Sequence, residues 1–433
     1  MKGDTHNKMS KNVVIIGAGP AGLWAAKELA DAGVDVTVIE QKKDFNNLRR
    51  ACSMQFILDD DYEGEGVAVG NGKLIFEKSG FEVPYTGKLV RVNNKYYHSP
   101  KGNTIRFARN DGKEPFSYKF DKGRMIKDLY ELCGKSGVKF MMNTVALGAK
   151  DAGDEVEITH NGDTHSITAS KLIIAEGVNA SVCTSAGMNA GRMHMATAFC
   201  VKYIVEGITG IEENSWNLYY GRAYHSNAAV IIGTSLYGDG IYEVTITGDK
   251  NNRPDDIFRK FTTDSPMSDN FKNAKILDKL GCSVKAFNSM QEPCKGNIIA
   301  IGDAAAMVEV EVQGGFLCGH HAANAVIKEL NGENGWDEYT KWWQSSFEFN
   351  SSDHMRVAQG YALVPVYTDD ELDYLFGLIQ GECLYGTYSQ YKTPKLIWDS
   401  IHKYDDKIKA ERPEIYAKME KMNSMSLANT FDK

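Results

Sequence analysis

The order of apolar and polar residues divides the chain into strand-like and helix-like stretches. An apolar run at 12–16 is followed by an amphipathic stretch and by a second apolar run at 36–39, a pattern typical of a βαβ unit. Apolar residues recur at helical spacing over 120–137. A long helix is predicted to start after the Gly314-Gly315 pair.

Short apolar or alternating runs predict the remaining strands, with turn residues between them. Asn161-Gly162 separates two such runs and predicts a β-hairpin. The segment 308–312 alternates valine with glutamate and also resembles a strand, whereas the pattern beyond 336 is mostly helical. The other predicted strands lie at 88–92, 104–107, 138–142, 155–158, 165–167, 171–177, 228–232, 241–246 and 297–303.

Three glycines stand in the turn of the first βαβ unit with the spacing of a dinucleotide site. Gly17 permits the tight turn, Gly19 lets a pyrophosphate approach the backbone, and Gly22 lets the helix pack closely on the strand. Glu40 ends the second strand roughly 20 residues on, where an acid binds ribose hydroxyls. We therefore predict a dinucleotide-binding unit with phosphates at the helix N-terminus.

Composition and charge exclude several classes of protein. The chain has 433 residues and a net charge of −8, which favours neither nucleic acid nor an anionic membrane. No apolar run approaches the roughly 18 residues of a membrane helix, and the first residues lack the apolar core of a signal peptide. The eight cysteines form no CxxC pair, so we predict no metal and a reducing, cytoplasmic location.

Two further motifs, together with the glycine turn, resemble the FAD-dependent superfamily that contains p-hydroxybenzoate hydroxylase and the geranylgeranyl reductases. IIAEGVNASV at 173–182 is similar to the family's GADGxxSxV segment, with Glu176 in place of the usual Asp. AIGDAAAMVEVEVQGGFLCGHHAANAV at 300–326 is similar to the GDAAG…G…SGxxAA segment of the reductases and of electron-transfer flavoprotein dehydrogenases. Ala306 replaces a usual glycine of that segment, and Val310 a usual proline.

The resemblance implies one noncovalent FAD and suggests which residues hold it. Asp303 would bind the ribityl or pyrophosphate region, and Gly314 and Gly315 would bring backbone N–H groups toward the isoalloxazine ring. The predicted FAD-binding residues are Gly17, Gly19, Pro20, Ala21, Gly22, Glu40, Gln41, Arg50, Ala51, Val145, Glu176, Gly177, Gly302, Asp303, Gly314 and Gly315.

Pattern and resemblance together predict an α/β fold in three parts. A Rossmann-like FAD-binding domain is assembled from the discontinuous segments 10–85, 120–190 and 285–332. A mainly β substrate domain, made of 86–119 and 191–284, is inserted into it. Residues 333–433 form a C-terminal helical region.

Cys52 is the first candidate for a reactive side chain. It follows Arg49-Arg50-Ala51, at the place where the reductases carry a KxCG-type element near the flavin. The neighbouring arginines would favour a thiolate or bind FAD phosphate. The alternative is a small buried thiol that only packs.

His320 and Glu309 are weaker catalytic candidates. His320 is predicted to donate a proton at the flavin edge, although histidines in such helices more often pack or cap. Glu309 is predicted to act as a general acid, and the alternative is an exposed strand edge. Lys122, with Arg124 close by, lies near the place of a frequent family arginine.

The resemblance implies an oxidoreductase that passes two electrons through flavin N5 to or from a small, unsaturated organic substrate. Reduction of a carbon–carbon double bond, or dehydrogenation, is favoured over aromatic monooxygenation. A binding module without flavin, like the Rab GDP-dissociation inhibitors of similar fold, is the alternative from another class. No second dinucleotide fingerprint occurs, so NAD(P)H, a ferredoxin or an electron-transfer flavoprotein is the expected electron partner.

Overall fold

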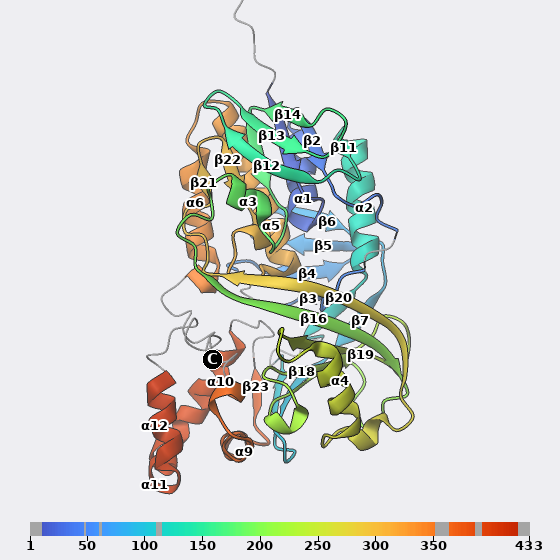
Figure 1. The fold of residues 1–433 in the computed structure, drawn as a ribbon, viewed down its shortest axis with the longest axis vertical. Coiled ribbons are helices and arrows are strands. Elements are labelled where there is room, and N and C mark those ends of the chain that lie inside the picture. Colours follow the sequence, from blue (N-terminus) through green and yellow to red (C-terminus); the bar gives the residue numbers. More distant parts are fainter. Residues whose placement is uncertain are drawn as a thin grey trace, which may run out of the picture. The chain divides into compact units, whose positions relative to one another are not determined.

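The computed structural model describes residues 11–46, 49–59, 63–109, 115–350, 363–385 and 392–422. The chain forms two compact units, each assembled from three separate segments (Figure 1). The first unit comprises 1–47, 123–193 and 288–347, and the second comprises 48–122, 194–287 and 348–433. Residues 48–85 thus fall in the second unit, together with the chain from 348 on.

A six-stranded sheet organises the first unit. Its order is β11-β2-β1-β15-β22-β21, and every pairing is parallel except that of β21. Parallel neighbours end at the same edge, so segments far apart in sequence meet there. The strands are β1 (Asn12–Ile16), β2 (Asp35–Ile39), β11 (Lys139–Met141), β15 (Lys171–Ile174), β21 (Cys294–Lys295) and β22 (Ile298–Ala300).

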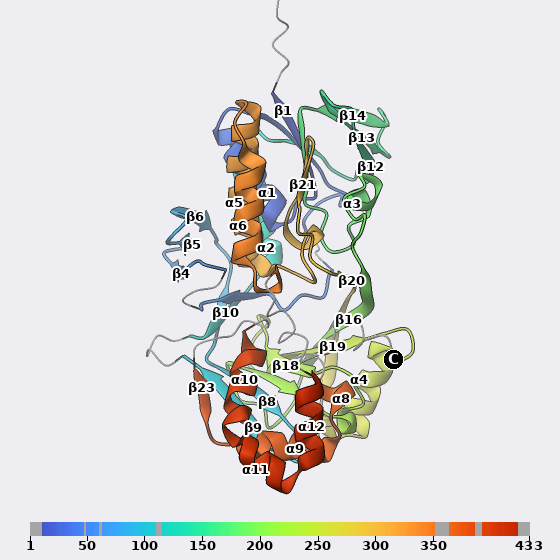
Figure 2. The ribbon, with the colours of Figure 1, turned by 90° about the vertical axis from the view of Figure 1, so that its left-hand side faces the viewer.

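Helices α1 (Pro20–Asp31) and α5 (Glu311–Leu330) pack closely in the first unit, with α6 (Gly335–Ser346) against α5 (Figure 2). Gly319 allows this approach, because a Cβ there would lie 2.5 Å from the Ala21 carbonyl oxygen. Trp24 and Phe316 meet edge to face across the same interface, with ring centroids 6.0 Å apart. This unit also contains α3 (Ser181–Ser185) and α2 (Lys122–Lys135). The first residue of α2, Lys122, is assigned to the second unit.

A small antiparallel sheet completes the first unit and confirms the predicted hairpin. Strands β12 (Ala146–Asp151), β13 (Val156–His160) and β14 (Ser166–Ala169) pair in chain order. The turn between β13 and β14 holds Asn161-Gly162, as its sequence predicts.

An eight-stranded sheet dominates the second unit, in the order β20-β16-β19-β18-β17-β8-β9-β23. Two of its strands, β16 and β20, are thirteen residues long. Its strands are β8 (Asn94–His98), β9 (Thr104–Ala108), β16 (His194–Glu206), β17 (Ser215–Tyr219), β18 (Val230–Thr234), β19 (Ile241–Gly248), β20 (Lys275–Phe287) and β23 (Cys383–Tyr385).

Two apolar cores stabilise the second unit. One includes Tyr203, Val230 and Val244 of the large sheet with Ile257 and Phe261 of α4 (Pro254–Thr263). The other joins residues of the same sheet to the C-terminal helices. These helices are α8 (Leu363–Val366), α9 (Asp369–Leu378), α10 (Thr393–Ile401), α11 (Asp405–Glu411) and α12 (Pro413–Met422).

Two small three-stranded sheets also belong to the second unit. The order of the first is β3-β10-β7, and that of the second is β4-β5-β6. Their strands are β3 (Gln55–Ile57), β4 (Val67–Gly70), β5 (Lys73–Phe76), β6 (Phe81–Pro84), β7 (Leu89–Val92) and β10 (Ser117–Phe120).

The segment around 308–312 differs from its prediction. It is not a strand: bends follow β22, and α5 begins at Glu311, whose φ is +57°. Gly314 and Gly315 are therefore the fourth and fifth residues of α5 and do not precede the helix. The alternation of valine and glutamate was misleading because Asp303, a residue outside the run, holds Val310 by accepting its backbone N–H at 3.0 Å.

Candidate functional site

The three motifs follow the carboxyl ends of adjacent strands β1, β15 and β22 in the first unit. Gly17, directly after β1, has a φ of +102°, and a Cβ there would lie 2.3 Å from the Ala175 carbonyl oxygen. Gly22 is equally constrained, because its Cβ would lie 2.0 Å from the Gly17 carbonyl oxygen. These two glycines are thus required by the protein's own packing.

Gly19 has a different reason to be glycine. It is the N-cap of α1, and a Cβ there would meet no heavy atom within 4 Å among the described residues outside its own chain neighbours. Open space therefore lies in front of the helix N-terminus, whose free N–H groups and positive dipole end attract phosphates. This is the arrangement that a pyrophosphate needs.

Glu40 is almost fully buried and holds the glycine turn. Its carboxylate accepts the backbone N–H of Ala18 at 2.9 Å and that of Lys42 at 2.8 Å. A carboxylate offers about four acceptor sites, so these bonds leave capacity for ribose hydroxyls. The ribose contact stays a prediction, as does any contact from the exposed Gln41.

The start of the third motif meets the N-terminus of α1. A Cβ on Gly302 would lie 3.4 Å from the Ala21 Cβ, and one on Gly315 would lie 3.5 Å from the Pro20 Cβ. The first turns of α1 and α5 are therefore neighbours, and Asp303 stands beside them at the end of β22. Two helix N-termini and the glycine turn form one cradle, which fits an anionic dinucleotide.

Glu176 of the second motif serves as a helix cap. Its carboxylate accepts the backbone N–H groups of Val182 and Cys183 at 3.0 and 2.8 Å, together with the Ser181 hydroxyl at 2.9 Å. The longer side chain thus fulfils an N-terminal capping role for α3. Gly177 takes a φ of +80°, and Val145 is 38% exposed. Contacts of Glu176, Gly177 and Val145 with a cofactor remain predictions.

Arg192 is a residue of this site that the sequence did not reveal. Its guanidinium donates to the carbonyl oxygens of Ala304 at 3.0 Å, Ala305 at 3.3 Å and Ala306 at 2.8 Å, and so fixes the loop between β22 and α5. Burial lowers the pKa of Arg192 to about 10. Backbone carbonyls more than 100 residues away leave no signal in a sequence pattern.

His320 and Glu309 have different surroundings within the first unit. His320 Nδ1 lies 2.9 Å from both carboxylate oxygens of Glu28, so it joins α5 to α1. Glu309 is partly buried in the loop that precedes α5. The structure tests neither catalytic role, and both stay predictions.

Cys52, Arg50 and Ala51 belong to the second unit. Cys52 is partly buried, and its Sγ lies 3.7 Å from the Lys122 Nζ. Arg49 instead forms an ion pair with Asp278 at 2.6 Å, while Arg50 is exposed. A lysine ammonium group is thus in contact with the thiol.

A fully buried ion cluster, made of Lys119, Lys202 and Glu243, lies in the same unit. Both lysines donate to the Glu243 Oε2, Lys202 at 2.5 Å. Burial lowers the pKa of Lys119 to about 8. Burial alone would raise the pKa of Glu243, but the two lysines outweigh it and hold that pKa below its usual value.

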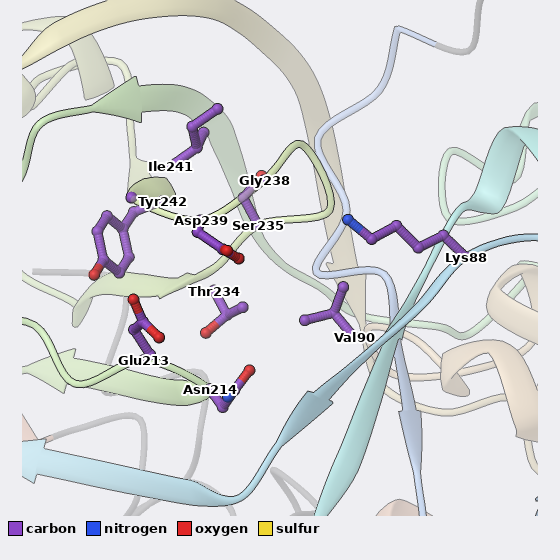
Figure 3. Close-up of a pocket in the computed structure, with 11 residues that line it drawn as sticks. Lys88, Val90, Glu213, Asn214, Thr234, Ser235, Gly238, Asp239, Ile241 and Tyr242 are labelled. Carbon is purple, nitrogen blue, oxygen red and sulfur yellow. The ribbon is translucent and has the colours of Figure 1, made fainter.

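Figure 3 shows a separate small cavity in the second unit. Its volume is about 70 Å³, and Lys88, Glu213, Asp239 and Tyr242 are among its lining residues. Sites for organic ligands measure roughly 300–1,000 Å³, so this cavity is too small for such a ligand.

The described part of the chain has neither a metal-binding cluster nor a membrane-spanning helix. No group of three or more His, Cys, Asp or Glu residues is arranged to hold a metal ion there. None of the helices described combines the length and apolar character needed to cross a membrane.

Comparisons with known proteins extend these observations. A family model described as "FAD binding domain" matches residues 10–316. Digeranylgeranylglycerophospholipid reductase 1 of Methanococcoides burtonii is 24% identical over 378 residues, which cover 84% of this chain and 86% of that protein. The family model covers the first two motifs, the third as far as Phe316, and parts of both units.

Two solved structures share the fold. A geranylgeranyl bacteriochlorophyll reductase-like protein from Thermoplasma acidophilum aligns with a TM-score of 0.71 and 18% identity, covering 95% of this chain and 98% of that one. p-Nitrophenol 4-monooxygenase from Pseudomonas putida aligns with a TM-score of 0.58 and 16% identity, covering 96% and 98%.

Proposed function

We propose that this chain, which belongs to the FAD binding domain family and is an FAD-dependent oxidoreductase, reduces carbon–carbon double bonds of a polyprenyl substrate. One observation supports the substrate class above all. The chain is related, over most of both lengths, to a protein named for the reduction of digeranylgeranylglycerophospholipid. A lipid with geranylgeranyl chains is therefore the substrate to try first.

The residues of the cradle would bind and orient FAD. The free N–H groups at the N-terminus of α1, left accessible by Gly19, would hold the pyrophosphate. Asp303 would fix the ribityl region, and Arg192 would keep its loop in place. When bound, FAD supplies the two-electron chemistry, while the protein supplies position, dryness and a proton.

We assign the proton to Cys52. Saturating one double bond adds a hydride to one carbon and a proton to the other, so an acid must face the second carbon. The Cys52 S–H bond would break, its proton would form the new C–H bond, and the sulfur would keep the electron pair. The ammonium group of Lys122, 3.7 Å from Sγ, would compensate the charge left on sulfur.

The products of a single anaerobic assay test this function. Enzyme reduced with dithionite is mixed with a digeranylgeranyl lipid, and the lipid is analysed by mass spectrometry. We expect a gain of two hydrogen atoms for each double bond reduced. An unchanged lipid after many equivalents of reduced enzyme would contradict the proposal.

Aromatic monooxygenation is the second candidate, because the fold is shared with p-nitrophenol 4-monooxygenase. It predicts oxygen insertion into a phenol when reduced enzyme meets O₂. The likeness in fold is lower for that enzyme than for the reductase-like protein, which favours the first candidate. A binding module without flavin would purify colourless, so the absorbance of the protein separates it from both enzymes.

The source of electrons is also a proposal. No second dinucleotide fingerprint occurs in the sequence, so a transiently bound NAD(P)H, a ferredoxin or an electron-transfer flavoprotein would reduce the FAD. Flavin reduction by each candidate in a stopped-flow instrument distinguishes them.

A further inference from the structure

Four contacts hold the Cys52 segment, defined as residues 51–54. In each contact, an atom of one segment residue is the acceptor, and the donor belongs to β10, β20 or the start of α2. The contacts are Cys282 Sγ to Ala51 O at 3.5 Å, Lys122 Nζ to Cys52 Sγ at 3.7 Å, Lys119 Nζ to Ser53 O at 2.7 Å and Phe120 N to Met54 O at 3.0 Å. Met54 also takes a left-handed φ of +51°. A non-glycine residue in this conformation persists only where its surroundings enforce it.

One of these contacts leads into the buried ion cluster. Lys119 donates to the Ser53 carbonyl and, with the same Nζ, to the Glu243 carboxylate. The Nζ also lies 4.9 Å from the centre of the Trp216 ring. Trp216 lies over Gly233, where a Cβ would come within 1.9 Å of the ring, and Gly233 pairs with Glu243 in the sheet. The position of Lys119 is thus fixed from several sides.

A buried ion cluster needs a reason other than stability. Removing charges from water is costly, and well-packed apolar residues often stabilise a fold as well as a buried ion pair does. Here two ammonium groups share one carboxylate, all fully buried. The cluster does, however, hold the Lys119 ammonium group in a fixed position, from which it donates to the residue next to Cys52.

We propose that Lys119 is a positioning residue for Cys52, and that its buried ion pair with Glu243 fixes Lys119 for this purpose. The proposal rests on the catalytic role proposed for Cys52. A proton donor must be held at hydrogen-bond range of its acceptor, and a misplacement of 1 Å lowers turnover by about a hundredfold. The bond from Lys119 to Ser53 restrains the backbone on which the thiol is carried.

Lys202 offers a matched control. Like Lys119 it is fully buried, and it donates to the same oxygen of Glu243. Lys119 donates also to Ser53, whereas Lys202 lies on β16 and its bond goes to Glu243. Lys119→Met and Lys202→Met each leave one lysine paired with one glutamate, so neither strands an unpaired buried charge.

The two variants are compared by hydrogen exchange and by turnover. We expect peptides covering 49–57 to exchange about tenfold faster in Lys119→Met, because local opening is sensitive to lost hydrogen bonds. We expect kcat to fall about tenfold or more with KM nearly unchanged, since only positioning in the reacting complex is lost. Lys202→Met should stay within about twofold of wild type in both measurements.

Equal effects of Lys119→Met and Lys202→Met on peptide 49–57 would overturn the positioning role and leave a merely structural cluster. If Lys119→Met does not fold, Lys119→Gln replaces it, because a shorter uncharged donor cannot reach both Ser53 and Glu243. The exchange measurement requires no turnover. Normal turnover in Cys52→Ser would therefore contradict the role of Cys52 separately, whatever the exchange of 49–57 shows.

Discussion

At the residue scale, Gly17, Gly19 and Gly22 stand in one turn for different reasons. A side chain on Gly17 or Gly22 would collide with backbone carbonyl oxygens at 2.3 and 2.0 Å. A side chain on Gly19 would enter the space in front of α1. The first pair serves the fold, whereas Gly19 is predicted to serve the cofactor.

A pair of alanine variants separates these two roles. Gly19→Ala should fold normally but bind FAD more weakly, since its methyl group would enter the space predicted for the pyrophosphate. Gly22→Ala should lower the free energy of unfolding by about 1–3 kcal/mol, the usual cost of overpacking. Thermal unfolding of the apoprotein and FAD titration measure the two effects. Full FAD affinity in Gly19→Ala would show that the phosphates do not bind at the N-terminus of α1.

Cys52→Ser tests the proposed proton donor. Serine is nearly isosteric but a much weaker acid, so FAD should stay bound while turnover falls by about 10²-fold or more, the usual worth of a general acid. Cys383→Ser, at a partly exposed cysteine of β23, is the matched control and should retain full turnover. Turnover of Cys52→Ser within a factor of two of wild type would show that the thiol only packs.

At the scale of elements, the site depends on how α5 begins and where it packs. Asp303 holds the backbone of Val310 one residue before the helix, and Arg192 holds the preceding loop by three carbonyl oxygens. His320 joins the same helix to α1 through Glu28. His321 packs against α6, where its ring stacks on Trp342 at 4.0 Å. Helix α5 is thus held at its start by Asp303 and Arg192, and near its middle by contacts with α1 and α6.

The packing of α6 on α5 should weaken in mild acid. Burial lowers the pKa of His321 to about 4 from an ordinary value of 6.5, so the folded protein holds this ring neutral. The free energy of unfolding is therefore unaffected by His321 above pH 6.5. As the pH falls toward 4, protonation of this ring in the unfolded chain lowers that free energy by at most about 3 kcal/mol.

The measurement is thermal unfolding between pH 7 and 4.5 for wild type and His321→Phe. Phenylalanine keeps an aromatic ring against Trp342 and cannot titrate, so the melting temperature of the variant should fall less across this range. Parallel curves for the two proteins would show that His321 is not held neutral.

At the scale of the whole molecule, local patterns predicted what depends on neighbours in sequence. The glycine turn, α2 and the hairpin at Asn161-Gly162 follow from local spacing, and the structure confirms them. The start of α5 was misjudged because Asp303, eight residues earlier, decides it.

The buried ion cluster was beyond reach of sequence reasoning for the same reason. A lysine in a strand is ordinarily read as solvent-facing. Lys119 is buried because Glu243, on another strand, pairs with it. Such pairs over long sequence distances leave no periodic signal in a single sequence.

In the proposed reaction, electrons leave this enzyme for a carbon–carbon double bond. The most direct measurement is the rate at which the anaerobically reduced enzyme is reoxidised, followed by flavin absorbance. A digeranylgeranyl lipid and O₂ are compared as oxidants at equal concentration. We expect fast reoxidation by the lipid and slow reoxidation by O₂. Fast reoxidation by O₂ that accelerates with a phenol, and none by the lipid, would contradict it.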